Sequence, residues 1–595
     1  MNKQRLHQYI KHFTVEHCVI RFLMAWCFIS ILQTLRVRII AFQRINNLDF
    51  IGATNFYVTV LLVVVMFFLT DLLFEILNRR RIEKIVLFAV TFSYALLCIG
   101  QYQDLYFCIG MVCLMGFSVA YCMKDTDTSR IGLKRPVFIT GAIVCIILFV
   151  LFTGGCTVYK YLTYRSPNYD LGLFSQMFYY MKHTLTMNTT AERDMLLSHL
   201  CVHVSPVFYL LLPIYAIVSS PATLQILQAV VLAMAIIPLR LICKNHGLNR
   251  FETLAILVAY SAYPVISGGC FYDIHENMFL PVFLLFFLYY LESDQKVGYV
   301  ISMLLIFSVK EDAAIYVAFI AIYEMFGLRR WKRGAVILLS ALAYFTFTTV
   351  LLANIGEGAM TYRFNNMIYG EDGSMFGIIK TVFNNPAYIM TQMFTKDKLE
   401  FIIQVLAPLC FLPLLSRKWY RFILIGPFLM FNLMSDYEYF HSLFFQYVFG
   451  SGTLLFYLAV VNLSEMDRKI KSHMLMMLPV SCLLFFMTIL GPKTYYITDY
   501  YDSLNQRTYQ EFEEALNMIP DDASVTATTF LCPKLSNRKV LHELYYTDKS
   551  TEYIALDLRV ETSEYSVNTY LNQDEYECLY YVPDKIAVFR YLDYE

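Results

Sequence analysis

Long apolar runs alternate with short polar segments over most of this chain, and the runs have the length of membrane spans. A helix needs roughly 17 to 25 mostly apolar residues to cross a bilayer. The pattern predicts about fifteen spans, with the shortest between 277 and 326 and between 401 and 435. They lie near residues 18–35, 57–77, 84–101, 105–122, 136–155, 222–242, 253–269, 277–291, 298–310, 312–326, 335–354, 401–416, 421–435, 443–462 and 473–490.

Composition supports an all-α polytopic membrane protein. Hydrophobic residues make up 58% of the 595 residues and charged residues only 16%, whereas soluble domains carry about 25% charged residues. The net charge is +0, so nothing indicates nucleic acid as a partner. The lipid bilayer is the first partner that the sequence predicts.

Basic residues in short loops predict the orientation, because such loops stay on the cytoplasmic side. Alternation through the spans places the main basic clusters inside, with the N-terminus cytoplasmic and the C-terminus outside. This requires 203–218, which contains two prolines, to lie as a helix at the outer interface. The clusters lie near residues 79–81, 134–135, 329–333, 417–418 and 468–469.

Changes in composition divide the chain into three parts. Residues 1–135 form an N-terminal extension of four spans, and 136–490 form a core with large outer loops at 156–221 and 355–400. Residues 491–595 have the composition of a soluble domain. There, 506–519 has helical periodicity and several short apolar runs are typical of strands. We expect a small extracytoplasmic α/β domain, in which Cys532 and Cys578 form a disulfide as one of two alternatives.

Asp170 is the first candidate for chemistry. It follows a full-length span in the sequence NYDLGLFSQ, and a partly desolvated carboxylate can accept a proton from a hydroxyl group. The alternative is a helix N-cap, because Asp before this run would start a helix well. Spacing alone does not separate the two.

Further ionisable residues gather in the outer loops. His199 and His203 are four apart, with Asp194 upstream, which suits a metal site, substrate binding, or one hydrogen-bonding histidine beside one without a role. Asp273, His275 and Glu276 share one turn and either line a site or cap a helix. Lys310, Glu311 and Asp312 interrupt an apolar stretch, as a helical hairpin or as a buried ion pair. Among the cations of loop 355–400, Arg363 between Tyr362 and Phe364 is the candidate for an anionic headgroup.

Several motifs occur together in a recognisable order. They are YDLGLFSQ (169–176), HVSPVFYLLLPIY (203–215), LQILQAVVLAMAIIPL (224–239), FYDIHEN (271–277), VKEDAAIYV (309–317), NLMS (432–435), HSLFFQY (441–447) and ASVTATTFLCPKLSNR (523–538). With these, the stretch from about 136 to 560 resembles the bacterial membrane proteins of domain-of-unknown-function family 2079. That family in turn resembles, in layout, the GT-C superfamily of membrane glycosyltransferases, which have an acidic residue in the first large outer loop and take sugars from polyprenyl-phosphate carriers.

The resemblance implies a function. It suggests an extracytoplasmic glycosyltransferase that moves a sugar from a polyprenyl-phosphate donor to a cell-envelope glycan, lipid or protein, with Asp170 as general base. GT-C members often have paired acids, whereas Leu171 and Gly172 follow Asp170 here, so a Mg²⁺ or Mn²⁺ requirement stays open. The substrate-binding residues expected are Gln176, His199, His203, Asp273, His275, Glu276, Lys310, Glu311, Asp312, Arg363 and His441.

Two other classes of function remain as alternatives. A transporter or flippase of lipid-linked intermediates would use the same charges as a path and would have broken helices near the midplane. A non-catalytic membrane-anchored binding protein would tolerate single replacements of its outer-loop charges.

Overall fold

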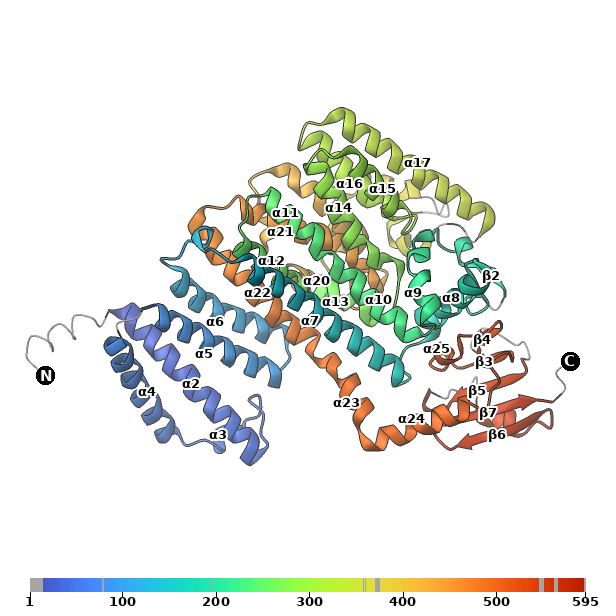
Figure 1. Cartoon of the computed structure of the whole chain (residues 1–595), viewed down its shortest axis with the longest axis horizontal. Helices are drawn as coiled ribbons and strands as arrows, with labels where there is room; N and C mark the ends of the chain where they lie inside the picture. Colours follow the sequence, from blue (N-terminus) through green and yellow to red (C-terminus); the bar gives the residue numbers. More distant parts are fainter. Residues whose placement is uncertain are drawn as a thin grey trace, which may run out of the picture.

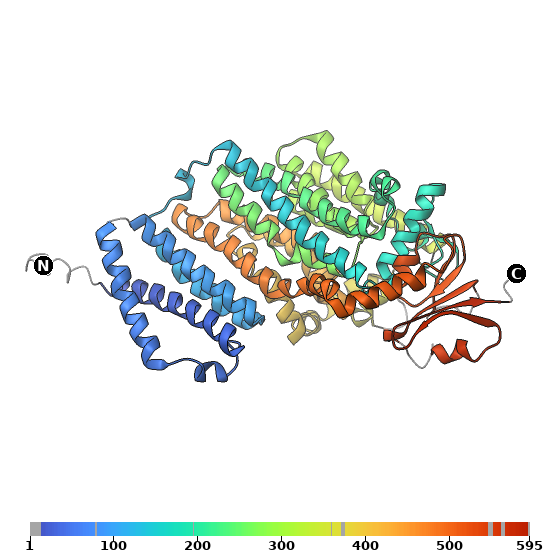
Figure 2. The ribbon, with the colours of Figure 1, turned by 60° about the horizontal axis from the view of Figure 1, so that its bottom comes forward.

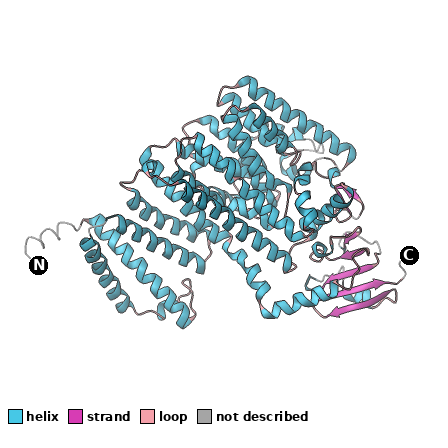
Figure 3. Cartoon of the chain, in the orientation of Figure 1, coloured by secondary structure: helices cyan, strands magenta, loops and turns pink. Residues whose placement is uncertain are grey.

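The computed structural model describes residues 14–77, 80–193, 195–356, 358, 360–369, 375–544, 551–560 and 566–592. It is predominantly helical, with a small sheet at the C-terminal end (Figure 3). The predicted class, a helical multi-pass membrane protein with a small C-terminal α/β region, is confirmed at this level.

The first helices form a group at one end of the molecule (Figure 1). Thr14 and Asp104 cap two of them by accepting hydrogen bonds from the backbone N–H of His17 and Phe107. The group contacts the remaining helices through α5 and α6, which pack on α22 (Arg468–Ile489). Its members are α2 (Val15–Ala41), α3 (Asp49–Gly52), α4 (Phe56–Leu77), α5 (Arg80–Gln101) and α6 (Leu105–Met123).

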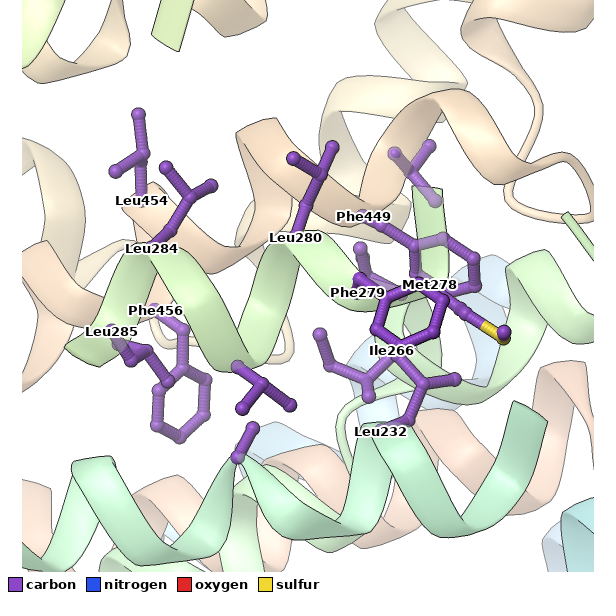
Figure 4. Close-up of a cluster of buried hydrophobic side chains, with 14 of the residues drawn as sticks. Leu232, Ile266, Met278, Phe279, Leu280, Leu284, Leu285, Phe449, Leu454 and Phe456 are labelled. Carbon is purple, nitrogen blue, oxygen red and sulfur yellow. The ribbon is translucent and has the colours of Figure 1, made fainter. Parts of the chain in front are cut away.

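The central helices enclose the main hydrophobic core. Figure 4 shows side chains of α10, α14 and α21 meeting in it, with Leu232, Leu284 and Phe456 among them. Every residue of α21 from Phe449 to Leu463 is buried, as expected for a helix that is apolar on all sides. The helices are α7 (Arg135–Leu162), α10 (Pro221–Met234), α11 (Ile236–Asn245), α12 (Arg250–Ser261), α13 (Pro264–Gly268), α14 (Leu280–Glu292), α15 (Lys296–Phe307), α16 (Ala313–Phe326), α17 (Trp331–Ile355) and α21 (Phe449–Ser464).

Ten helices in the described ranges are long and apolar enough to cross a membrane, so the count of about fifteen is not confirmed. The predicted spans 277–291, 298–310 and 312–326 correspond to the shorter helices α14, α15 and α16. The predicted span 401–416 is broken: α20 (Lys396–Leu406) ends before Pro408, and only the short turn η8 (Leu412–Leu414) follows. The predicted span 421–435 corresponds to one irregular helical stretch, in which η9 (Trp419–Ile425) continues through Gly426 and Pro427 into the π-helical η10 (Phe428–Met434).

The loop after α7 folds into short elements beside the core. The predicted interfacial segment 203–218 forms η4 (Pro206–Leu210) and α9 (Leu212–Ile217), whose Leu210, Ile214 and Ile217 are exposed. The other elements of this loop are η2 (Asn168–Gly172), α8 (Leu173–Thr184), β1 (Asn188–Thr189), β2 (Leu197–Ser198) and η3 (His199–Cys201). Loop 355–400 contains η7 (Thr361–Met367), α18 (Met375–Asn384) and α19 (Pro386–Met393), and the turns η11 (Glu438–His441) and η12 (Gln446–Val448) follow η10.

The C-terminal region is a five-stranded mixed sheet with helix α24 packed on β6 and β7 (Figure 2). The order is β4-β3-β5-β7-β6; β3 is parallel to β4 and β5, whereas β7 is antiparallel to β5 and β6. The predicted helix 506–519 and four predicted strands are confirmed, and the three-residue β4 was missed. The elements are α23 (Tyr495–Tyr501), α24 (Ser503–Leu516), β3 (Val525–Ala527), α25 (Cys532–Leu535), β4 (Leu541–Glu543), β5 (Tyr553–Asp557), α26 (Val567–Leu571), β6 (Tyr576–Val582) and β7 (Ile586–Tyr591).

The cysteines of this region are not bridged. Cys532 is buried and Cys578 is exposed on β6, and neither takes part in a disulfide. The disulfide alternative is therefore wrong for this structure.

Candidate functional site

A cavity of about 340 Å³ lies beside Asp170, between the loop after α7 and the segment that follows α17. Segments far apart in the sequence form its wall, which combines carboxylates, imidazoles, arginines and tyrosines. The lining residues are Tyr169, Asp170, Leu173, Phe174, Glu192, Arg193, His199, Val202, His203, Tyr272, His275, Met360, Tyr362, Arg363, Tyr437, Tyr439, Phe445, Gln446 and Tyr447.

Asp170 presents an unsatisfied carboxylate to this cavity. Its Oδ2 is buried without a hydrogen-bond partner and lies 4.0 Å from Nε2 of His275. Burial, reinforced by the nearby charges of Glu276 and Asp273, raises the pKa of Asp170 to about 8. No side chain caps α8, which begins at Leu173, so Asp170 is not the N-cap of that helix.

Three histidines of the cavity wall share one arrangement: the Nδ1 atom of each lies against a glutamate. This orients the ring and leaves Nε2 for another interaction. The Nε2 of His199 is buried without a hydrogen bond, and Phe174 packs against the rings of both His199 and His275. The pairs are His199 with Glu192 at 3.1 Å, His203 with Glu311 at 2.9 Å, and His275 with Glu276 at 3.0 Å.

The three histidines differ in the direction of their pKa shifts because their surroundings differ. Burial lowers the pKa of His275 to about 4, despite Glu276, and also lowers the pKa of His203. Burial works in the same direction at His199, but the charge and hydrogen bond of Glu192 outweigh it and raise the pKa of His199. The cavity therefore holds a neutral His275 at neutral pH, next to an acid of unusually high pKa.

Lys310, Glu311 and Asp312 lie between α15 and α16, where the sequence predicted a break. Both proposed interpretations hold, because the chain turns there and Lys310 is also buried as an ion pair. Its Nζ lies 3.1 Å from Oε1 of Glu276, with angles that are not those of a hydrogen bond. Burial raises the pKa of Asp312 to about 6. None of these three residues lines the cavity. Glu311 contacts His203 of the wall, and Lys310 contacts Glu276, which is the partner of His275.

Arg363 is the cation of the opposite wall. Its guanidinium lies 5.0 Å from the ring centroid of Tyr437 and 5.4 Å from that of Tyr447. Within the described ranges it forms no ion pair with a carboxylate, and its Nε is buried without a hydrogen bond. A guanidinium set among aromatic rings, without a protein anion, is suited to a phosphate group.

Asp273 serves a different purpose. Lys160 donates a hydrogen bond of 2.8 Å to its Oδ2, and Ser166 and Gln225 donate to its Oδ1. Its side chain is fully buried and does not line the cavity. These contacts tie the end of α7 to α10 and to the turn before α14.

Gln176 and His441 are also placed away from the cavity. The side-chain oxygen of Gln176 accepts hydrogen bonds from Thr189 and Thr190, and its amide donates to the carbonyl of Arg538 in the C-terminal region. His441 pairs with Asp397 at 2.8 Å. A substrate-binding role for either stays a prediction.

The C-terminal region positions the turn that carries Asp170. Asn168 donates 2.8 Å hydrogen bonds to Glu543 of β4 and to the carbonyl of Ala191, and its backbone N–H donates to Thr529. Tyr164 and Ala191 belong to the same hydrophobic cluster as the sheet. The turn is thus held by contacts across more than 300 residues of sequence.

The wall also contains Glu192, Arg193 and the tyrosines 437, 439 and 447, which were not predicted from the sequence. Glu192 lies seven residues from His199. That separation is two turns of a helix, but the structure has β2 directly before His199, so helical spacing is not what brings the two side chains together. The tyrosines belong to a broken segment and are typical of membrane interfaces, so nothing in the sequence distinguished them.

In the part of the chain that the structure describes, no group of three or more His, Cys, Asp or Glu side chains is arranged to hold a metal ion. Asp194, considered with His199 and His203 as a ligand, lies outside the described residues. A requirement for Mg²⁺ or Mn²⁺ stays a prediction.

Comparisons with known proteins agree with the membrane architecture. No curated protein matches the chain. The family described as predicted membrane protein, DUF2079, matches residues 160–583, from the end of α7 to the turn after β6. Since this match includes the whole cavity and covers well over half of the sequence, the chain belongs to the DUF2079 family of membrane proteins.

Proposed function

We propose that this protein is an extracytoplasmic glycosyltransferase that transfers a sugar from a polyprenyl-phosphate donor to a cell-envelope acceptor. The observation that carries the proposal is the buried, unpaired carboxylate of Asp170, in one cavity with Arg363. The GT-C-like fold, the outward orientation of this face and the polyprenyl-phosphate donor are parts of the same proposal.

In this mechanism the ionised form of Asp170 takes the proton of an acceptor hydroxyl group. The acceptor oxygen then forms a bond to the anomeric carbon, while the bond between that carbon and the phosphate oxygen breaks. Arg363 stabilises the negative charge that develops on the departing polyprenyl phosphate. A carboxylate with a pKa of about 8 is a stronger base than an ordinary Asp, although less of it is ionised at pH 7.

The histidines orient the reactants. At neutral pH a His275 whose Nδ1–H faces Glu276 directs the lone pair of Nε2 toward Asp170. With a pKa of about 4 against about 8 for Asp170, it accepts a hydrogen bond from a substrate hydroxyl or from protonated Asp170, and the proton itself stays on Asp170. Arg193, whose Nη1 donates to the hydroxyl of Tyr169, adds a second positive charge to the wall. Tyr362, Tyr437 and Tyr447 provide faces on which a sugar ring can stack.

The test uses purified full-length protein in nanodiscs. A panel of polyprenyl-phosphate sugars is supplied with and without Mg²⁺ or Mn²⁺, and release of free polyprenyl phosphate is measured. We expect release by the wild type and a loss of about 10²- to 10⁴-fold in Asp170→Asn, the range for general-base assistance. Glu438→Gln is the matched control, since Glu438 is exposed on the same group of loops and does not line the cavity.

Equal release by the wild type and Asp170→Asn would remove Asp170 from the mechanism. One observation favours the alternative of a flippase for lipid-linked intermediates: the helical stretch of η9 and η10 is irregular, changing from 3-10 to π geometry at Gly426 and Pro427, and interrupted helices are typical of transporters. Tight donor binding without release, together with donor translocation in vesicles, would support that alternative instead.

A further inference from the structure

A second and larger cavity lies at the other end of the membrane helices. It is a groove of about 810 Å³ between the beginning of α7, helix α11 and the beginning of α12. Helix α7 starts at this groove with Arg135 and ends at Leu162, shortly before Asp170. Since α7 has 28 residues and rises 1.5 Å per residue, it is roughly 42 Å long, and the groove lies along its first half, from Arg135 to Ile146.

The floor and sides of this groove are apolar and open sideways. Ile139, Ile143 and Ile237 line it and are 43%, 50% and 48% exposed. Both α7 and the segment Pro221–Asn245 are candidate membrane spans, so side chains exposed along them face lipid. The groove is therefore accessible from within the bilayer, and its surface suits hydrocarbon chains.

One end of the groove is strongly basic. Arg135, Arg240, Lys244 and Arg250 line it, and no acidic residue does. Two of them are fixed in place: the guanidinium of Arg240 lies 5.8 Å from the ring centroid of Phe138, and Arg250 donates a hydrogen bond to the carbonyl of Leu133. None of the four forms an ion pair within the ranges described.

The groove combines a missing counter-charge with an apolar surface, whereas several other cations at short loops are paired with acidic residues. Lys471 is paired with Glu252, and Arg333 with Glu324 and Asp294. Lys418 and Arg421 share Glu465. In those clusters the protein supplies the anion. At the groove, four positive charges gather at the end of an apolar surface and no carboxylate balances them.

We propose that this groove binds an anionic diacyl phospholipid. Its phosphate lies among Arg240, Lys244, Arg250 and Arg135, and its chains follow the isoleucines of α7 and α11. Arginine and lysine recognise lipid phosphate through charge-assisted hydrogen bonds. The basic loops predict that this end is cytoplasmic, which places the lipid in the inner leaflet. This inference does not depend on the proposed glycosyltransferase activity.

The experiment measures lipid binding by the full-length protein in a neutral detergent. Phosphatidylglycerol, phosphatidylcholine and a polyprenyl phosphate are added separately, and retained lipid is measured by native mass spectrometry, with a thermal melt in parallel. We expect phosphatidylglycerol to be retained and to raise the Tm, and phosphatidylcholine to do neither. Arg240→Gln combined with Lys244→Gln should weaken retention about tenfold or more, because each charge near a lipid phosphate contributes about 1 kcal/mol.

Two further variants separate a built site from general surface charge. Ala142→Trp fills the groove without changing any charge, and should also reduce retention, since Ala142 lines the groove. Lys296→Gln with Lys332→Gln removes two exposed positive charges elsewhere and should leave retention unchanged. A melt of each variant without lipid checks that it is folded.

Several results would overturn the proposal. They are equal retention of the two phospholipids, undiminished retention by the Arg240 and Lys244 variant, or an equal loss in the Lys296 and Lys332 control. Retention that survives in Ala142→Trp would show surface attraction without insertion of the chains. Stronger retention of polyprenyl phosphate than of phosphatidylglycerol would make the carrier lipid, and not a membrane phospholipid, the occupant.

Discussion

Asp170 and Asp273 belong to neighbouring loops, but their carboxylates differ in burial and in hydrogen bonding. The carboxylate of Asp273 is fully buried and accepts hydrogen bonds from Lys160, Ser166 and Gln225. The side chain of Asp170 is 15% exposed, and its Oδ2 has no hydrogen-bond partner. One carboxylate has every partner that it needs, whereas the other faces a cavity.

This difference separates a structural contact from a candidate for chemistry. A buried ion pair with complete hydrogen bonding holds elements together and has nothing left to offer a substrate. An unsatisfied acid is unfavourable for folding and is retained where its reactivity is used. The charges that the sequence predicted as one binding site therefore divide into a wall, formed by Asp170, His199, His203, His275 and Arg363, and a support behind it.

The largest expected effect comes from replacing each of the two carboxylates with an amide and comparing the stability of the two variants. Asp273→Asn should lower the free energy of unfolding by about 3–5 kcal/mol, because it leaves the charge of Lys160 buried without its counter-ion. Asp170→Asn should not destabilise the protein. Thermal melts followed with a thiol-reactive dye suit this test, since most of the cysteines are buried free thiols. Equal melting temperatures of the two variants would contradict the division into support and wall.

The pH dependence of stability tests the raised pKa of Asp170. The pKa of Asp170 is raised to about 8 in the folded protein, so the folded state binds a proton that the unfolded state releases from about pH 4 upward. Stability should therefore fall as pH rises from about 4 to 8, by on the order of 2–4 kcal/mol at neutral pH. Asp170→Asn should lack this fall. The Tm difference between variant and wild type, measured from pH 5 to 8.5, should increase; a constant difference would contradict the high pKa.

Breaking the contact between the C-terminal region and the turn should reduce activity without touching the cavity wall. Asn168→Ala removes the hydrogen bonds to Ala191 and to the buried Glu543, and should destabilise the protein by about 1–3 kcal/mol. It should also lower kcat by displacing Asp170. Glu543→Gln is the control, because a Gln oxygen can still accept the hydrogen bond from Asn168. The same loss in both variants would indicate that the charge of Glu543, and not the hydrogen bond, matters.

The smallest expected effect on activity comes from replacing Glu192, which was not predicted from the sequence. Glu192→Gln removes the charge that raises the pKa of His199 while keeping an acceptor for its Nδ1–H. We expect a loss of about tenfold in kcat, comparable to about 1.4 kcal/mol, and a shift of the corresponding limb of the pH–rate profile to lower pH. A merely structural role would lower stability and leave the shape of that profile unchanged.

Local patterns predicted much of the architecture. The apolar runs in the first 162 residues correspond to α2, α4, α5, α6 and α7, and the alternating segments after residue 520 correspond to strands. The prediction failed at 401–416, where α20 ends at Leu406 just before Pro408, whereas the predicted span 421–435 corresponds to the irregular helical stretch of η9 and η10. The turn at Lys310 was visible because three charges interrupt a long apolar stretch.

The sequence by itself determined that this protein spans a membrane, that its polar chemistry gathers in a few loops, and that a small α/β region follows. Only the tertiary structure decided which charges meet. Burial and pairing depend on contacts between distant segments, such as Lys160 with Asp273, His203 with Glu311, and Asn168 with Glu543. Asp170 and Asp273 are the same residue type in similar polar loops, and their partners alone make one a support and the other the candidate base.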